Sequence, residues 1–368
     1  MTHPKQRSYA VDVARGFCLV IMTLDHLPSN VLSRFTNTNF GPFGFFTATS
    51  AFVFLSGLVA AWVYGSTYRE RGPAATWSQV LRRAAQVYAV NTSLFVLIFV
   101  GVSLQFLTSA AWQVHFPEFF AEPWNALHQG LLLLYRPGYF NILPMYILFL
   151  LITPLALAAI QASRAWVVVG LSALTWAWVQ IAYPELRTLN AFGYQILFVA
   201  GLVIGSIPDM DEKLRSPTGI RIAQLSLAVA GCLLLARFGL GLLRSDGPDV
   251  PGWQSFTSVD NNGPLRLVNF ALFALGATYL WRQAPIQLKT VPMLRWFAHL
   301  GQHSLHVFAW SVLMTYVSIA LMPVQPSRLW CVINILLTLS SLTIPATLHA
   351  WLTQRGQPYP LGRRAPVV

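Results

Sequence analysis

The chain has 368 residues, of which 55% are hydrophobic and only 10% are charged. Soluble domains usually carry about 25% charged residues, so this composition excludes an ordinary soluble protein. The net charge of +12 does not indicate nucleic-acid binding, because the basic residues stand in short clusters between long apolar runs. We therefore predict an all-α polytopic integral membrane protein, with a single membrane-embedded domain over residues 1–368.

Ten runs of the chain are apolar and long enough to cross a bilayer, for which a helix needs about 20 residues. They cover residues 9–28, 43–64, 81–107, 139–161, 164–182, 189–207, 221–243, 264–283, 294–322 and 328–353. The second run is preceded by Gly-Pro and is compatible with a partly re-entrant segment. The expectation is about ten transmembrane helices.

The distribution of Lys and Arg predicts the orientation, because cytoplasmic loops carry an excess of positive charge. With the N-terminus inside, sixteen basic residues fall in inner segments and five in outer loops, namely Arg34, Arg136, Arg187, Arg244 and Arg328. Both termini are therefore expected in the cytoplasm. The first run carries charges and lacks a small-residue cleavage site, so no cleaved signal peptide is expected. These features are compatible with a multi-pass protein of the bacterial inner (cytoplasmic) membrane.

Two sets of residues bear on metal binding. The three cysteines lie in different apolar runs, which makes a disulfide framework or a thiolate metal site unfavourable: Cys18, Cys232 and Cys331. Three histidines share one helix face by their spacing of four and three residues: His299, His303 and His306. That spacing can bind a metal, but no carboxylate or cysteine lies close in sequence, and a polar start of a helix is the simpler alternative. We expect no metal.

The first apolar run contains four ionisable side chains. It reads YAVDVARGFCLVIMTLDHLP, and its charged or titratable residues are Asp12, Arg15, Asp25 and His26. Ionisable groups inside a membrane are expensive and usually mark a functional site. Four of them in one apolar helix are hard to explain by packing alone.

The spacing of these residues predicts how they are arranged. Arg15 and His26 are eleven residues apart, so at about 100° per residue they share a face, with about 16 Å between them along the axis. Arg15 is therefore expected near the cytoplasmic boundary and His26 deeper, toward the outside. Asp12 lies one turn before Arg15 and can pair with it. Asp25 can orient the imidazole of His26, although adjacent helical residues diverge by about 100°.

This arrangement suits an enzyme that is reached from both sides of a membrane. Arg15 can hold the phosphates of a cytoplasmic donor. His26 can act as a general base on a hydroxyl group, or can itself carry an acyl group. The simpler alternatives are a snorkelling Arg15 paired with Asp12, and a core histidine that donates to a backbone carbonyl.

Two further clusters are candidates for ligand binding. Arg82 and Arg83 open the third run on the inner side, where they would meet anionic lipid or a nucleotide-like donor. The fourth run begins at the outside with hydrogen-bonding groups in GYFNILPMY, namely Tyr139, Asn141 and Tyr146. We expect these three near the acceptor, with helix capping as the alternative.

The outer loops at residues 108–138 and 244–263 hold aromatic rings beside polar groups, such as Trp112 and Trp253. Such surfaces often grip carbohydrate, and an interfacial aromatic belt is the alternative. The sequence has no Walker loop, no GxSxG elbow and no HExxH motif, and no soluble domain that would hold ATP. Primary active transport is therefore not expected.

The segment RSYAVDVARGFCLVIMTLDHLPSN resembles the opening of the OpgC family, membrane succinyltransferases that modify osmoregulated periplasmic glucans. That family is related to the type-three membrane acyltransferases, whose first helix carries Arg, ten residues and then His. Arg15 and His26 match this spacing. Later blocks also resemble the family, in order: NFGPFG with FVFLSGLVAAWVYG, ILPMYILFLLITPL, LNAFGYQILFVAGLVIG and LGQHSLHVFAW.

The resemblance implies ten helices, use of acyl-CoA on the cytoplasmic side and acylation of a glycan hydroxyl outside. Succinyl-CoA would be the co-substrate, with no tightly bound cofactor, and a glucan synthase is a compatible partner. By matching position, His26 would be the catalytic base or acyl acceptor, with Asp25 and Arg15 beside it. Arg82 and Arg83 lie where the wider superfamily carries an arginine motif linked to the donor.

The chain departs from the family between the NFG and FVFLSG blocks. The family carries acidic residues there, whereas this stretch reads FFTATSA and has no Asp or Glu. If those acids select the acceptor or the acyl group, the resemblance still implies acyl transfer, but it leaves succinyl as the acyl group and glucan as the acceptor open.

Two functions from other classes also fit part of the sequence. A proton-coupled transporter of a small anionic or glycan-like solute would use the four ionisable groups of the first run as a proton relay. Transporters often show inverted repeats with paired broken helices, and no such repeat is visible in the sequence. A non-catalytic partner would bind glycan or lipid for a separate synthase and consume no CoA thioester. The residues together favour an integral membrane O-acyltransferase.

Overall fold

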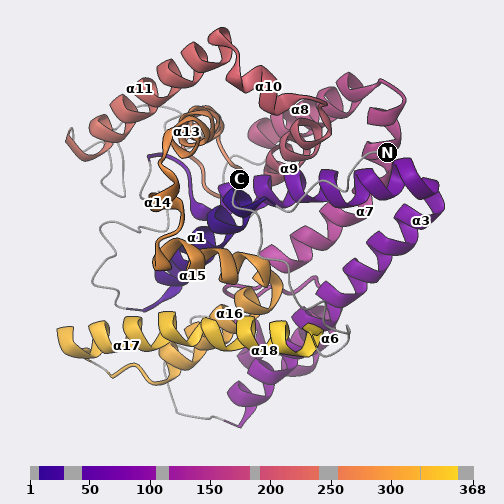
Figure 1. Cartoon of the computed structure of the whole chain (residues 1–368). Coiled ribbons are helices and arrows are strands. Elements are labelled where there is room, and N and C mark those ends of the chain that lie inside the picture. The colour runs from indigo at the N-terminus through magenta and orange to yellow at the C-terminus, as the bar shows by residue number, and fades with distance from the viewer. Residues whose placement is uncertain are drawn as a thin grey trace.

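The computed structural model describes residues 8–28, 44–104, 116–182, 191–239, 256–323 and 325–354, and within these the regular structure is entirely helical (Figure 1). The helices, in chain order, are α1 (Tyr9–His26), α3 (Ala48–Ser103), α5 (Pro117–Ala121), α6 (Pro123–Leu131), α7 (Ile142–Gln161), α8 (Ala165–Ala182), α9 (Ala191–Ser206), α10 (Met210–Arg215), α11 (Pro217–Gly239), α13 (Pro264–Gln283), α14 (Ile286–Lys289), α15 (Pro292–Gln302), α16 (Ser304–Ala320), α17 (Arg328–Ser341) and α18 (Thr343–Gln354). The predicted all-α class is confirmed for this part of the chain.

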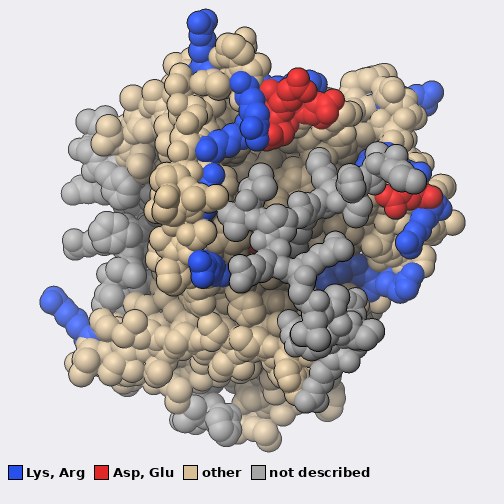
Figure 2. Space-filling view, viewed as in Figure 1, with Lys and Arg blue, Asp and Glu red and all other residues tan. Residues whose placement is uncertain are grey.

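The surface of the helices is suited to lipid. Among the described residues, five helical segments are long and apolar enough to cross a membrane: α3, α7, α8, most of α11, and α17 together with α18. Large apolar side chains point outward, among them Trp166 at 75% exposure, Leu174 at 70% and Leu235 at 72%. Uncharged residues cover most of the face in Figure 2. These features indicate a membrane protein, while ten spans and cytoplasmic termini stay predictions.

Helix α3 joins two of the predicted runs, 43–64 and 81–107, into one bent element of 56 residues. The bend lies at Gly72, whose φ of 80° and ψ of −179° are not helical, and Pro73 follows it. Glycine alone adopts this backbone region readily, and proline lacks the N–H that would continue the hydrogen-bond ladder. A bond from the Thr67 hydroxyl to Gln79 Oε1 at 2.7 Å joins the two arms beside the bend, which Figure 1 shows diverging.

Two other predicted runs are broken into shorter helices. The run at 294–322 forms α15 and α16, separated by His303 at φ −114° and ψ 29°. The run at 328–353 forms α17 and α18, which meet at Leu342 and lie end to end in Figure 1. Leu342 keeps helical dihedral angles, with φ −60° and ψ −21°. The break at His303 leaves backbone groups outside the regular ladder, so polar partners are needed near it.

Helix α1 is held at the centre of the molecule by contacts between backbones. It packs against α15, α3 and α16, and Figure 1 shows it surrounded by other helices. A Cβ on Gly16 would overlap the carbonyl oxygen of Phe297, and a Cβ on Gly301 would overlap that of Asp12. Close approach through small residues is the usual way in which helices associate in membranes. The crossing of α1 and α15 therefore fixes the position of α1.

Candidate active site along α1

Arg15 is held on the first half of α1 by contacts with two other helices. Its Nη2 donates a hydrogen bond to the Ser304 hydroxyl at 2.6 Å, and its guanidinium carbon lies 5.6 Å from the centre of the Phe52 ring. The second contact is a cation–π interaction, which becomes stronger where water is excluded. Asp12, one turn earlier, is only 4% exposed. Arg15 therefore occupies a fixed position between α3 and α16.

His26 is the last residue of α1. Leu27 is extended at ψ 131° and precedes Pro28, which disfavours a further helical turn. The imidazole lies against the Tyr139 ring, with 4.2 Å between centroids and 31° between planes. The Tyr139 hydroxyl donates to the His26 backbone carbonyl at 3.3 Å. His26 and its neighbour Asp25 are both half-buried, so this end of α1 is not closed off completely.

Tyr316 on α16 supports Tyr139 and was not found by the sequence analysis. Its side chain is 2% exposed, and its ring centre lies 5.8 Å from that of Tyr139. Its hydroxyl accepts from the Tyr139 backbone N–H at 3.4 Å and donates to the Pro137 carbonyl at 3.4 Å. Tyr316 therefore fixes the ring that covers His26. The only signal in the sequence is a tyrosine within an apolar run.

Helix α16 connects the two ends of the predicted catalytic face. Ser304 at its start bonds Arg15, and Tyr316 near its end contacts the tyrosine that covers His26. The separation of Ser304 and Tyr316 along α16 is about 18 Å, close to the roughly 16 Å between Arg15 and His26 along α1. The two helices therefore run side by side in the same direction, with Arg15 in direct contact with α16 and His26 linked to it through Tyr139.

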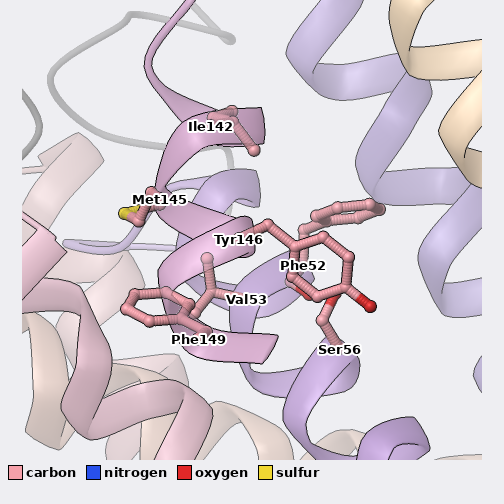
Figure 3. Close-up of a pocket in the computed structure, with 7 residues that line it drawn as sticks. All are labelled: Phe52, Val53, Ser56, Ile142, Met145, Tyr146 and Phe149. Carbon is pink, nitrogen blue, oxygen red and sulfur yellow. The ribbon is translucent and has the colours of Figure 1, made fainter. Parts of the chain in front are cut away.

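A small hollow lies between α3 and α7 beside the Arg15 contact. Figure 3 shows the Tyr146 ring reaching from α7 toward Phe52 and Ser56 on α3. Its lining is almost wholly apolar: Phe52, Val53, Ser56, Ile142, Met145, Tyr146 and Phe149. Because Phe52 also lies beneath the Arg15 guanidinium, the hollow adjoins a fixed positive charge.

Asn141 has a local role at the start of α7. Its Nδ2 donates to the Gly138 carbonyl at 3.2 Å, and Gly138 has a positive φ of 48°. The side chain occupies the N-cap position but makes no capping bond. Of the three residues predicted on the acceptor side, Tyr139 contacts His26, Tyr146 lines the hollow, and Asn141 stabilises the turn before α7.

The two arginines predicted to bind the donor, Arg82 and Arg83 of α3, have different surroundings. Arg82 is exposed and bonds to Ser78 on its own helix, with Nε donating to the backbone carbonyl and Nη2 to the hydroxyl. Arg83 is half-buried, and its Nη1 donates to Gln86 Oε1 at 3.4 Å. The structure therefore separates the pair that the sequence analysis had grouped.

Four histidines meet where α15, α16 and α18 converge. The Nδ1 atoms of His303 and His349 are 2.8 Å apart, the His306 and His349 rings are stacked with 4.0 Å between centroids, and the His299 and His303 centroids are 5.3 Å apart. Sequence spacing predicted the grouping on α15 and α16 but missed His349. Within the described ranges, no group of three or more His, Cys, Asp or Glu residues is arranged to hold a metal ion.

A second polar cluster surrounds Arg266 near the start of α13. Arg266 is fully buried, and its Nε donates to the Thr257 carbonyl at 2.7 Å. Burial raises the pKa of the Asp260 carboxyl above its usual range, while the positive charge of Arg266 opposes this rise. Asn269 Oδ1 accepts from the Phe45 backbone N–H at 2.6 Å. Through Arg266 and Asn269 the cluster ties α13 to the segment before it and to the segment before α3, a structural role that fits the complete burial of these two side chains.

Several predicted features lie outside the described residues. These are the outer-loop aromatic residues Trp112 and Trp253 and the first part of the NFGPFG block, residues 39–43. The carbohydrate interpretation of the outer loops therefore stays a prediction. The FFTATSA stretch that lacks acidic residues is described, and it leads into α3.

Comparison with known proteins gives one match. The family model described as "OpgC protein" matches residues 7–354, nearly the whole chain. No curated protein and no solved structure gives a significant match. The matched range includes α1 with both Arg15 and His26, Tyr139 before α7, and α16 with Ser304 and Tyr316. The chain belongs to the OpgC family.

Proposed function

We propose that the protein is an integral membrane O-acyltransferase that moves an acyl group, most simply succinyl, from cytoplasmic acyl-CoA to a hydroxyl of a periplasmic glucan. Family membership implies a glucan-modifying membrane acyltransferase, and the donor, acyl group and direction are the finer parts of the proposal. The observation that carries it is the arrangement along α1, where Arg15 bonds Ser304 at the start of α16 and His26 lies against Tyr139, whose ring contacts Tyr316 near the end of α16.

The contacts of Arg15 favour an acyl-CoA donor. A coenzyme A thioester carries phosphates at one end and the acyl group at the other, with a long, flexible and uncharged arm between them; a succinyl group itself ends in a carboxylate. Arg15 offers a fixed positive charge, and the apolar hollow beside Phe52 offers uncharged surroundings next to it. A phosphate near Arg15 and a thioester directed toward His26 would therefore both have suitable neighbours.

The contacts of His26 favour proton transfer at the other end. In direct transfer, His26 accepts the proton of a glucan hydroxyl while the hydroxyl oxygen attacks the thioester carbonyl carbon. A C–O bond forms, the C–S bond breaks, and the CoA thiolate takes up the proton held by His26. In the alternative, an imidazole nitrogen attacks first, and the acyl group passes from His26 to the glucan. Tyr139 is a positioning residue in both routes, because it covers one face of the imidazole. Asp25 would stabilise the protonated ring.

A proton-coupled transporter is the second candidate, and the helix break at His303 is the observation that favours it. Discontinuous helices are common at transport sites, and the sequence analysis did not predict the interruption at His303. A transporter would move solute and protons without consuming a thioester. The two functions therefore differ in a measurable chemical product.

The decisive experiment follows release of the CoA thiol. Purified protein in nanodiscs is incubated with succinyl-CoA or acetyl-CoA, with and without periplasmic glucan. We expect acceptor-dependent thiol release, and its loss in His26→Ala protein that elutes as a single species on size exclusion. Wild-type release in that variant would disprove the role of His26. If folded wild-type protein releases no thiol but acidifies the interior of proteoliposomes when solute is added, the transporter is correct.

A further inference from the structure

The short helix α6 has one side packed on α3 and one side turned away from it. Its buried residues are Ala126 and Gly130, and a Cβ on Gly130 would overlap the Phe95 ring of α3. At about 100° per residue, the opposite side of the helix presents a mixture of aromatic and polar side chains. We define the α6 face as Glu122, Trp124, Asn125, His128 and Gln129, of which all but the half-buried Gln129 are exposed.

Three polar side chains of the α6 face form a hydrogen-bonded row. Asn125 Nδ2 donates to Glu122 Oε2 at 3.1 Å, and Gln129 Nε2 donates to Asn125 Oδ1 at 3.0 Å. The row extends for about 10 Å along the helix, since it covers seven residues. An amide group carries two N–H donors and an acceptor oxygen, so each amide keeps capacity for a ligand after one such bond. A row of this kind matches hydroxyl groups, which both donate and accept.

Trp124 places an aromatic plane beside this row. Its side chain is 81% exposed, the largest exposure of any tryptophan that the described ranges contain. An indole offers an apolar face and one N–H donor. Sugar rings have an apolar face of C–H groups and an edge of hydroxyls, so an indole next to a row of amides is complementary to both parts of a sugar chain.

The charges near the α6 face favour an uncharged ligand over an anionic one. Between residues 116 and 138 the carboxylates are Glu118 and Glu122, and the only arginine is Arg136. Both carboxylates are exposed. An anionic lipid headgroup would be repelled by them, whereas a neutral polyhydroxyl chain would not.

Aromatic contacts connect the segment that carries the α6 face to the His26 end of α1. The Phe116 ring, just before α5, lies 5.3 Å from the Tyr316 ring. The Phe140 ring, which follows the segment, stacks on the same tyrosine at 6.1 Å. Tyr316 in turn supports Tyr139, whose ring covers His26. The segment therefore starts and ends at the residue that fixes the ring over His26.

We propose that the α6 face binds the acceptor glucan at sugar units remote from the reacting hydroxyl, and so selects chains over small sugars. The proposal rests on the proposed function, and on the predicted topology the α6 face lies on the outer side, where the acceptor arrives. Because the row is longer than one sugar ring, a longer chain makes more contacts. Binding energy from remote parts of a substrate then lowers the concentration of acceptor that the reaction needs.

A second exposed tryptophan supplies a matched control. Trp166 on α8 is 75% exposed, close to the value for Trp124, and lies far from the segment 116–140 in the sequence. Exposed tryptophans also serve as anchors at the membrane surface. A general anchoring effect would appear on loss of either tryptophan, whereas a glucan-binding surface depends on Trp124 and is insensitive to loss of Trp166.

The test measures binding of glucose, a glucose disaccharide and longer glucan oligomers to the full-length protein in nanodiscs, by calorimetry and without any CoA present. We expect affinity to rise with chain length. Trp124→Ala should weaken binding of the longest oligomer about tenfold, and Asn125→Ala, which breaks the row, about fivefold. Trp166→Ala should bind like wild type. Size exclusion and thermal unfolding of each variant establish that it is folded.

Three results would overturn the proposal. One is unchanged oligomer affinity in folded Trp124→Ala protein. The second is equal weakening by Trp124→Ala and Trp166→Ala. The third is an affinity that does not depend on chain length, because a surface that spans more than one ring requires such a dependence. If Trp124→Ala lowers the melting temperature in nanodiscs and leaves glucan affinity unchanged, Trp124 is a membrane anchor and the proposal is wrong.

Binding and catalysis fail independently in this design. If oligomer binding depends on Trp124 but no thiol is released from any acyl-CoA, the glucan-binding surface stands and the proposed function is wrong. If thiol release depends on glucan but neither release nor binding responds to Trp124→Ala, the proposed function stands and this inference is wrong. Where both hold, Trp124→Ala should raise KM for the acceptor and leave KM for acyl-CoA unchanged.

Discussion

The two ends of α1 use different physical interactions to hold their side chains. At the Arg15 end the contacts are directional and charged, with a hydrogen bond to Ser304 and a nearby group of histidines. At the His26 end the contacts are aromatic, with stacking on Tyr139 and support from Tyr316. Charged donors discriminate between ligands by charge, whereas stacked rings fix one orientation and exclude water. On the proposed function, this difference suits the Arg15 end to recognition of the donor and the His26 end to the reaction.

The largest expected effect on activity comes from removing the imidazole at the His26 end of α1. His26→Ala should lower kcat for acyl transfer by about 10²–10⁴-fold, the range for loss of a general base. The melting temperature should stay near that of wild type, because the imidazole is half-buried and covers little core surface. Thiol release and thermal unfolding of the same preparation check both statements. A variant that loses its fold together with its activity would contradict this separation.

The next largest effect is expected from a substitution at the crossing of α1 and α15, which positions both ends of α1. Gly16→Leu should destabilise the protein by about 1–3 kcal/mol, because its side chain would overlap the Phe297 backbone and force α1 away from α15. Gly170→Leu on α8 is the matched control, since a Cβ there meets nothing within 4 Å. Thermal unfolding of the two purified variants gives the comparison. Equal stability of both would show that the close crossing is unimportant.

A smaller effect is expected at the Arg15 end alone. Arg15→Ala should raise KM for acyl-CoA by about 10–100-fold and change kcat far less, because a charge-assisted contact to the donor is removed while His26 remains. Arg164→Ala, which removes an exposed arginine after α7, should leave both constants unchanged. Steady-state kinetics over a range of donor concentrations separates the two constants. A fall in kcat with unchanged KM would contradict the donor role.

The smallest effect is expected at Tyr139, where two substitutions separate the contribution of the ring from that of the hydroxyl. Tyr139→Phe keeps the ring against His26 and loses only the 3.3 Å hydrogen bond to its carbonyl, so kcat should fall by less than about tenfold. Tyr139→Ala removes the ring and should have a larger effect. If the phenylalanine variant is as impaired as the alanine variant, the hydroxyl, and not the stacked ring, is the important group.

Local features of the fold were predictable from the sequence, whereas long-range pairings were not. The all-α membrane character follows from composition, and the common face of Arg15 and His26 follows from helical periodicity. The bend at Gly72 has a local signal in its Gly-Pro pair, which the division into two separate runs overlooked. Tyr316 and His349 have no local signal, because their partners Tyr139 and His303 lie 177 and 46 residues away along the chain. The roles of the site residues stay predictions until they are measured.

The close crossing of α1 and α15 has a mechanical consequence. Rotation of α1 about its axis would replace Gly16 at the crossing with a bulkier neighbour such as Val13 or Phe17, for which the backbone of α15 leaves no space. Sliding would meet the same barrier at Gly301. Helix α1 is therefore locked to α15 at this crossing, and the two helices can move only as one unit. On the proposed function, donor and acceptor would approach along this unit while the separation of Arg15 and His26 along α1 stays the same.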